Sequence, residues 1–321
     1  MSVFEAALQI KFWSPIILFS IGAPGAFLNA IIFMGIKTFR QSPLVFYVVG
    51  QSLADVNVLL IVLLQIIPYT SISVSSIACK LMVFFMQMMT TVAMSFLCLS
   101  AFDRWASTSQ LARIRQLSSI RVACCLFPIP FILWSFVNIP FLIYCDIVPP
   151  IYICWFTNDL FMRIGVLFLS PILIVFLPLL ILILFGLLTY RNIRLVTHIR
   201  QQPNQTRMST WEHQMTRMML IQTLLSIFFT LPRAIYVVYS IATIDESTTR
   251  SFEQMSILLL VDQLTASITS MNFASSFYIF LISSSRFRQT IQIYLKYRFN
   301  MGHRQIAPMN ILLTAPTLTD R

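Results

Sequence analysis

An acidic and a basic residue stand side by side where a long apolar run of the sequence ends. The stretch SAFDRWASTSQLARIR, residues 100–115, places Asp103 next to Arg104 and continues into further arginines. A carboxylate can hold a guanidinium in a charge-assisted hydrogen bond. Ionisable groups at membrane depth cost at least about 2.5 kcal/mol each, so they persist mostly where they pair or act. The pair therefore predicts either a functional ion pair or an arginine that reaches phosphates at a membrane surface.

Other polar side chains interrupt the apolar runs farther along the chain. Asp55 stands in the middle of one run, and Arg233 follows a proline in another. Arg233 can receive an acidic group of a ligand, such as a peptide carboxylate, or form an internal salt bridge with Asp262. If Arg233 receives a ligand, it faces a ligand cavity inside the protein. The glutamines that can line this cavity are Gln65, Gln87 and Gln263.

The six cysteines predict one disulfide and no metal site. Three of them fall inside apolar runs, where a small apolar filler is expected: Cys98, Cys124 and Cys125. The other three lie near one side of the runs, where an oxidising compartment would permit a disulfide: Cys79, Cys145 and Cys154. We expect Cys79 to pair with Cys154, with Cys145 as the competing partner. No spacing matches a metal site and no catalytic constellation is present, so we predict neither an enzyme nor a cofactor.

The segments that position these residues are membrane-spanning. With 58% hydrophobic and 10% charged residues in a chain of 321, the sequence is far more apolar than a soluble domain. A helix needs about 20 predominantly apolar residues to cross a bilayer. Seven runs of this kind can be drawn, at approximately residues 14–36, 44–69, 78–103, 120–143, 163–190, 215–241 and 254–283.

These runs predict helices, because they are continuously apolar, whereas the strands of a membrane barrel alternate polar and apolar residues. The predicted fold class is therefore all-α, a seven-helix membrane bundle. We expect kinks at Pro68, Pro178 and Pro232. The segment 284–321 begins with SRFRQTIQIYLKYRF, which predicts a short amphipathic helix on the inner membrane face, followed by a tail.

Charge predicts the orientation of the bundle. The first, third and fifth loops and the C-terminal tail carry 17 of the 22 basic residues. Cytoplasmic loops retain positive charge, so residues 1–13 are expected outside the cell and residues 14–283 form the membrane domain of a plasma-membrane protein. The net charge of +11 is then explained by attraction to anionic lipid, which argues against a nucleic-acid partner.

The ordered set of motifs in these spans resembles the rhodopsin-like G-protein-coupled receptors over nearly the whole chain. DRW stands where that family has D-R-Y, and Cys79 precedes Arg104 by the family's spacing. The other matching positions are Asn29 in GAFLN, Asp55 in SLAD, Trp134 in LWS, and the prolines Pro178 and Pro232. The resemblance implies a receptor that binds an extracellular ligand and activates a heterotrimeric G protein by movement of the sixth helix. A transporter or channel is the alternative, although the sequence contains no internal repeat and no ring of charges.

The resemblance also implies roles for particular residues. Arg104 would be held by Asp103 and by Glu212 at the start of the sixth helix, and release of Arg104 would accompany activation. Asn29, Asp55 and Asn272 would form a polar relay, with a weak sodium site at Asp55, or else a hydrogen-bonded packing cluster. Ala93 weakens the sodium interpretation, because the family often has a hydroxyl there.

Several positions depart from the family pattern. Thr230 replaces the family's tryptophan in the sixth helix, and the seventh-helix N-P-x-x-Y motif falls on Ser276, Phe277 and Phe280, with Tyr278 as an alternative register. Met86 stands where amine receptors have an aspartate, so we expect a peptide rather than an amine. The predicted ligand-pocket residues are Arg233, Asp262, Gln65, Met86 and Gln87.

Overall fold

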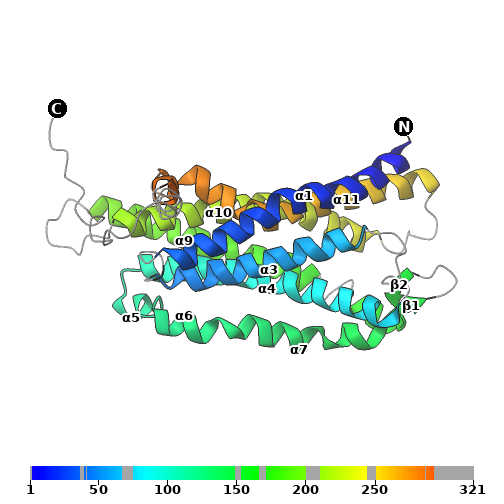
Figure 1. Cartoon of the computed structure of the whole chain (residues 1–321), viewed down its shortest axis with the longest axis horizontal. Helices are drawn as coiled ribbons and strands as arrows, with labels where there is room; N and C mark the ends of the chain where they lie inside the picture. The colour runs from blue at the N-terminus through cyan, green and yellow to red at the C-terminus, as the bar shows by residue number, and fades with distance from the viewer. Residues whose placement is uncertain are drawn as a thin grey trace, which may run out of the picture.

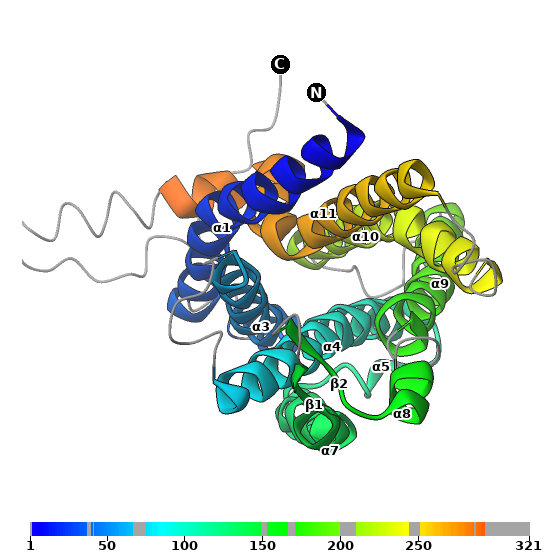
Figure 2. The same ribbon diagram turned by 90° about the vertical axis from the view of Figure 1, so that its right-hand side faces the viewer.

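The structure is a computed structural model that describes residues 2–36, 40, 42–66, 75–148, 153–165, 171–199, 210–243, 251–285 and 287–292. Within these residues, seven helical segments are long and apolar enough to cross a membrane. They form an elongated bundle (Figure 1), and they are arranged in a ring when the bundle is viewed from one end (Figure 2). The all-α class and the seven-helix bundle predicted from the apolar runs are confirmed.

Each predicted run corresponds to a helical segment of the bundle. The segments are α1 (Val3–Gly35), α3 (Leu44–Leu64), α4 (Ser76–Thr108), α6 and α7 (Ile120–Leu126 and Pro128–Tyr144), η2 and α9 (Ile172–Phe176 and Leu177–Ile199), α10 (Thr210–Ala242) and α11 (Phe252–Ser283). Shorter helices are α5 (Ala112–Arg115) and α8 (Asp159–Arg163). Residues 287–292 are also helical, at the place where a short helix after the seventh span was predicted.

The two ends of the bundle carry different structures. At one end, β1 (Cys145–Val148) and β2 (Ile153–Phe156) form an antiparallel hairpin that contacts α4 and lies at the same end as the start of α1 (Figure 1). The opposite end carries α5, between α4 and α6. These are named the hairpin end and the α5 end below.

The first helix is longer than its apolar run. It begins at Val3 rather than near residue 14, because Ser2 and Glu5 form a capping box that satisfies its first backbone donors. Hydropathy misses this start, since polar residues such as Gln9 and Lys11 dilute the apolar pattern without opposing a helix.

Prolines shape the fourth, fifth and sixth spans. Pro128 starts α7 after a break at Phe127, as expected for a residue that lacks a backbone donor. The π-helical turn η2 directly precedes Leu177 and Pro178, a position where proline removes a helical hydrogen bond. Pro232 lies inside α10, and Pro68 lies outside the described residues.

Two hydrophobic clusters hold the bundle together. One lies mainly between α3 and α4 and includes Val58 and Phe96. The Phe96 ring of α4 packs directly against Gly50 of α3, since a Cβ added at Gly50 would lie 2.6 Å from that ring. The second cluster lies toward the α5 end and joins α1, α3, α10 and α11 through residues such as Phe33 and Met218. This second cluster positions α10 next to the site described below.

Candidate functional site

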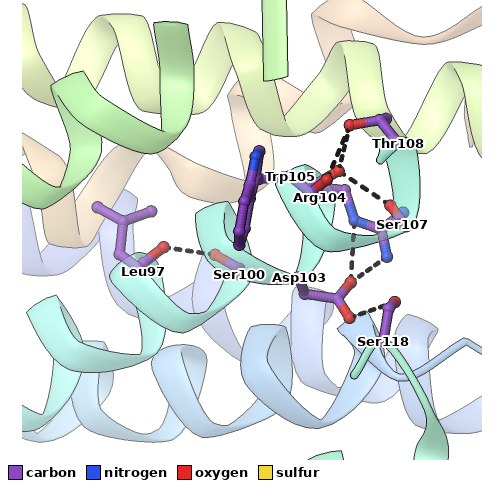
Figure 3. Close-up of polar contacts among 8 residues, drawn as sticks. All are labelled: Leu97, Ser100, Asp103, Arg104, Trp105, Ser107, Thr108 and Ser118. Carbon is purple, nitrogen blue, oxygen red and sulfur yellow. Dashed lines mark hydrogen bonds and ion pairs between the residues drawn. The ribbon is translucent and has the colours of Figure 1, made fainter. Parts of the chain in front are cut away.

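The charged pair of the opening motif lies buried in the last turns of α4, at the α5 end. Arg104 Nε donates a hydrogen bond of 3.0 Å to Asp103 Oδ2, and Arg104 Nη2 contacts the same oxygen. The other carboxylate oxygen, Oδ1, accepts a hydrogen bond of 2.6 Å from Ser118 Oγ. Figure 3 shows the three side chains pointing toward one another. The pair is thus an internal ion pair, with little access to solvent at either side chain.

The surroundings of Arg104 connect it to the fifth and sixth spans. Arg104 lines a small depression together with Phe185 and Thr189 of α9 and with Met219 and Thr223 of α10. The neighbouring residue Trp105 packs its ring against Phe185, with 5.3 Å between the two ring centroids. A displacement of α10 would therefore change the packing around Arg104.

Three polar residues predicted to form a relay are buried within the spans. Asn272 Nδ2 donates a hydrogen bond of 3.1 Å to Thr230 Oγ1 and so links α11 to α10. Asp55 is 0% exposed. Among the residues that the structure describes, neither Asp55 oxygen and neither amide atom of Asn29 has a hydrogen-bond partner. The structure thus buries all three without joining them by direct hydrogen bonds in its described part.

The disulfide predicted from the sequence is present. Cys79 in α4 is bonded to Cys154 in β2, with the two Cα atoms 5.6 Å apart, while Cys145 is buried as a free thiol. Lys80 Nζ lies 3.2 Å from Asp146 Oδ2 and adds a second link between α4 and the hairpin. Hydrogen bonding from the Ser76 side chain, then from the backbone of Ile147, holds the pKa of Asp146 below its ordinary value.

Arg233 and Asp262 form an ion pair between α10 and α11. Arg233 Nη1 lies 2.6 Å from Asp262 Oδ1, and the side chains are 28% and 31% exposed. Arg233 also donates to Thr265 Oγ1 at 3.3 Å and lies over the Tyr236 ring, 5.3 Å from its centroid. The internal salt bridge considered from the sequence is therefore formed, and it leaves part of each side chain accessible.

Comparison with known proteins identifies the family. Residues 28–272 match the family described as "7 transmembrane receptor (rhodopsin family)". The chain belongs to this family. No curated protein matches the sequence. The family membership makes the chain a multi-pass membrane receptor of the G-protein-coupled class, and it confirms the resemblance seen in the sequence motifs.

The remaining predicted residues of the receptor occupy different environments. Met86 packs against the first hydrophobic cluster, and Gln65 is exposed as the C-cap of α3. Gln87 is half-buried in α4, and Gln263 donates to Asp262 at 3.3 Å. Glu212 lies in the first turn of α10, but its side chain is outside the described part of the structure. The contact between Arg104 and Glu212 therefore stays a prediction.

The altered seventh-helix motif of the receptor has become part of the apolar packing. Phe277 and Phe280 belong to the second hydrophobic cluster, and Ser276 is buried. The Tyr278 hydroxyl donates a hydrogen bond of 2.9 Å to the Ile21 carbonyl of α1. Tyr278 therefore faces α1, which leaves aromatic packing rather than a tyrosine hydroxyl between α11 and α10.

Sequence reasoning missed one polar contact of the receptor. Gln222 Nε2 in α10 donates a hydrogen bond of 3.3 Å to Gln51 Oε1 in α3, and both side chains are buried. The available signal was a glutamine inside each of two apolar spans, where a polar side chain needs a partner. Periodicity alone did not show that the two glutamines face each other.

Proposed function

We propose that this receptor lies in the plasma membrane with its hairpin end outside and activates a heterotrimeric G protein at its α5 end. The observation that carries the proposal is the buried Asp103–Arg104 pair, in which the guanidinium is held by Asp103 while residue Arg104 borders α9 and α10. Basic side chains around the α5 end support this orientation, because cytoplasmic segments retain Lys and Arg; they include Arg113, Arg115, Arg191 and Arg194.

The proposed mechanism is a displacement of α10 away from α4. In the closed bundle, Asp103 holds Arg104 and Ser118 holds Asp103, so the cation is neutralised inside the protein. We expect Glu212 to provide a second acceptor at the start of α10. Movement of α10 would separate Glu212 from Arg104 and expose the guanidinium to the G protein. A ligand that binds the open form more tightly would bias this equilibrium.

The proposed ligand is a peptide with an acidic group. Arg233 and Asp262 retain partial exposure, so a ligand carboxylate can compete with Asp262 for the guanidinium. The hairpin is tethered to α4 by the disulfide, and we propose that it lies over the ligand entrance. We propose that Gln65, Met86 and Gln87 are further contacts of the peptide ligand between the hairpin and Arg233.

A sodium site at Asp55 remains part of the proposal. The residues present fit a hard cation, since both Asp55 oxygens and Asn272 Oδ1 are buried and unpartnered within the described structure. The amide oxygen of Asn29 is also buried and has no hydrogen-bond partner within the described structure. Ala93 contributes no oxygen, so we expect weak binding.

The test is nucleotide exchange by the purified full-length receptor in lipid nanodiscs with a panel of G proteins. A peptide library supplies candidate ligands, and amidated copies of active peptides test the carboxylate. Ligand-dependent exchange is expected. Solute flux through receptor-containing proteoliposomes, with no exchange on any G protein, would instead favour the transporter or channel alternative.

An epitope tag placed before Phe12 tests the orientation independently. We expect the tag to be labelled on intact cells, because the N-terminal start of α1 lies at the hairpin end. Labelling that requires permeabilisation would reverse the proposed orientation.

A further inference from the structure

Two glutamines meet in the interior of the bundle, between helices that are far apart in the sequence. Gln222 Nε2 in α10 donates to Gln51 Oε1 in α3 at 3.3 Å. Both side chains are almost fully buried, at 2% and 5% exposure. Gln51 lies one helical turn before Asp55, so both residues occupy the same face of α3.

The glutamine pair lies beside an apolar cluster, on the side of α3 that also carries Asp55. Met218 and Met219 of α10 belong to one hydrophobic cluster with Val48 and Val49 of α3. Within the described structure, Gln222 Oε1 has no hydrogen-bond partner. Gln51 therefore supplies the polar contact that makes burial of the Gln222 amide tolerable, because an unpaired amide in this environment is costly.

The position of Gln222 along α10 separates the glutamine pair from the Arg104 site. Gln222 lies ten positions after Glu212, which corresponds to about 15 Å along a helix. Its neighbour Thr223 borders Arg104 on the side of α4 and α9, whereas Gln222 itself contacts α3. The glutamine pair thus holds α10 at a deeper level of the bundle and to a different helix.

We propose that the Gln51–Gln222 hydrogen bond is a second restraint that keeps α10 closed against α3. When α10 moves outward, the two amides separate, and the closed bundle loses a buried hydrogen bond. This inference rests on the α10 movement of the proposed function, but it adds residues that the Arg104 site does not contain. Gln51 and Gln222 are positioning residues, since they act on helix geometry and touch neither ligand nor G protein in this account.

A double-mutant cycle tests the proposed restraint on the full-length receptor in nanodiscs. Spin labels at Arg113→Cys and Arg217→Cys, two exposed positions on α5 and α10, report the separation of these helices without any G protein. The exposed cysteines Cys124 and Cys125 are replaced by Ser in every sample. The variants are Gln51→Leu, Gln222→Leu and the double replacement.

Each single replacement removes the Gln51–Gln222 hydrogen bond from the closed bundle and should raise the ratio of long to short label distances. Hydrogen bonds between membrane helices predict a rise of about threefold, and of no more than about twentyfold. The double replacement removes the same single hydrogen bond, so it should raise the ratio no further than the larger single effect. Leu224→Ala, at a position of α10 that is 64% exposed, should leave the distances unchanged.

Two results would overturn the restraint: a double variant whose effect is the product of the two single effects, or well-folded single variants with unchanged distances. A thermal-unfolding measurement on each sample identifies the folded variants. If a leucine variant does not fold, Gln51→Asn and Gln222→Asn shorten the same side chains and replace it in the cycle.

The distance measurement also separates this proposal from the proposed coupling. Non-additive shifts in a receptor that catalyses no nucleotide exchange would support the restraint and reject G-protein activation. Exchange by the wild-type receptor, together with unchanged distances in the folded glutamine variants, would support activation and reject the restraint.

Discussion

Asp103 and Ser118 are joined by a hydrogen bond of 2.6 Å, which occupies the carboxylate oxygen that Arg104 leaves free. One carboxylate therefore serves two elements, because Oδ2 neutralises the arginine of α4 and Oδ1 fixes the segment between α5 and α6. Because the two Asp103 oxygens have different partners, the effect of the carboxylate charge on Arg104 can be tested separately from the effect of the hydrogen bond to Ser118.

Asp103→Asn should raise ligand-independent signalling more than Ser118→Ala does. The asparagine keeps an oxygen for Ser118 but removes the charge that faces Arg104, and a hydrogen bond to a charged group contributes about 1.5–3 kcal/mol. The serine variant keeps that charge. Basal nucleotide exchange at matched surface levels measures both. Equal increases from the two variants would indicate that Asp103 acts through position alone.

Glu212→Ala should also raise ligand-independent signalling. Loss of one charge-assisted contact would increase an open population of about one in a thousand roughly ten- to a hundredfold. A cell-based G-protein reporter checks the increase, and Glu253→Ala, at the hairpin end of α11, is the matched control. An unchanged basal signal would remove Glu212 from the restraint on Arg104.

The Arg233–Asp262 pair predicts opposite effects of its two partners on an acidic peptide ligand. Arg233→Ala removes the cation and should weaken binding about tenfold or more, the effect of losing one hydrogen bond to a charged group. Asp262→Asn removes the competing carboxylate and should strengthen binding. Competition binding with free-acid and amidated forms of an active peptide measures both effects. Equal affinity of the two peptide forms for wild type would exclude a carboxylate contact.

Cys145 should be unreactive at neutral pH, although it lies in the same hairpin as the disulfide-bonded Cys154. Burial raises the pKa of the Cys145 thiol to about 11, so the neutral form dominates at pH 7. The folded chain then holds this proton more tightly than the unfolded chain. The resulting contribution to stability is present below pH 9 and is lost as the pH rises toward 11.

Labelling of intact cells with a membrane-impermeant maleimide checks this prediction. Thr157→Cys, at an exposed position just after the hairpin, should be labelled at pH 7, whereas the native Cys145 should not. Rapid labelling of Cys145 on the folded receptor would show that the hairpin opens.

The sequence predicted the features that depend on composition and on ordered motifs. Apolar runs located all seven spans, and the placement of three cysteines near one side of these runs indicated a disulfide from Cys79 to Cys154, with Cys145 as the competing partner. Contacts between distant helices were harder to predict, because they depend on the rotation of each helix about its axis. The Gln51–Gln222 contact was missed for this reason, and Arg233 could not be assigned to Asp262 or to a ligand.

Local chemistry explains the other differences between sequence and structure. The early start of α1 depends on the Ser2–Glu5 capping box rather than on hydropathy. The β1–β2 hairpin is stabilised by pairing such as Ile147 with Cys154, a contact between two short segments that carry no periodic signal of their own.

Nucleotide exchange by Arg104→Ala tests the central claim most directly. The purified variant is compared with wild type in nanodiscs, at equal ligand occupancy and with the G protein that responds to wild type. The account predicts that exchange is lost while surface expression and ligand binding remain near wild-type levels, because Arg104 contacts the G protein only after α10 has moved. Normal exchange by Arg104→Ala would contradict the account and leave the Asp103–Arg104 pair as a structural ion pair.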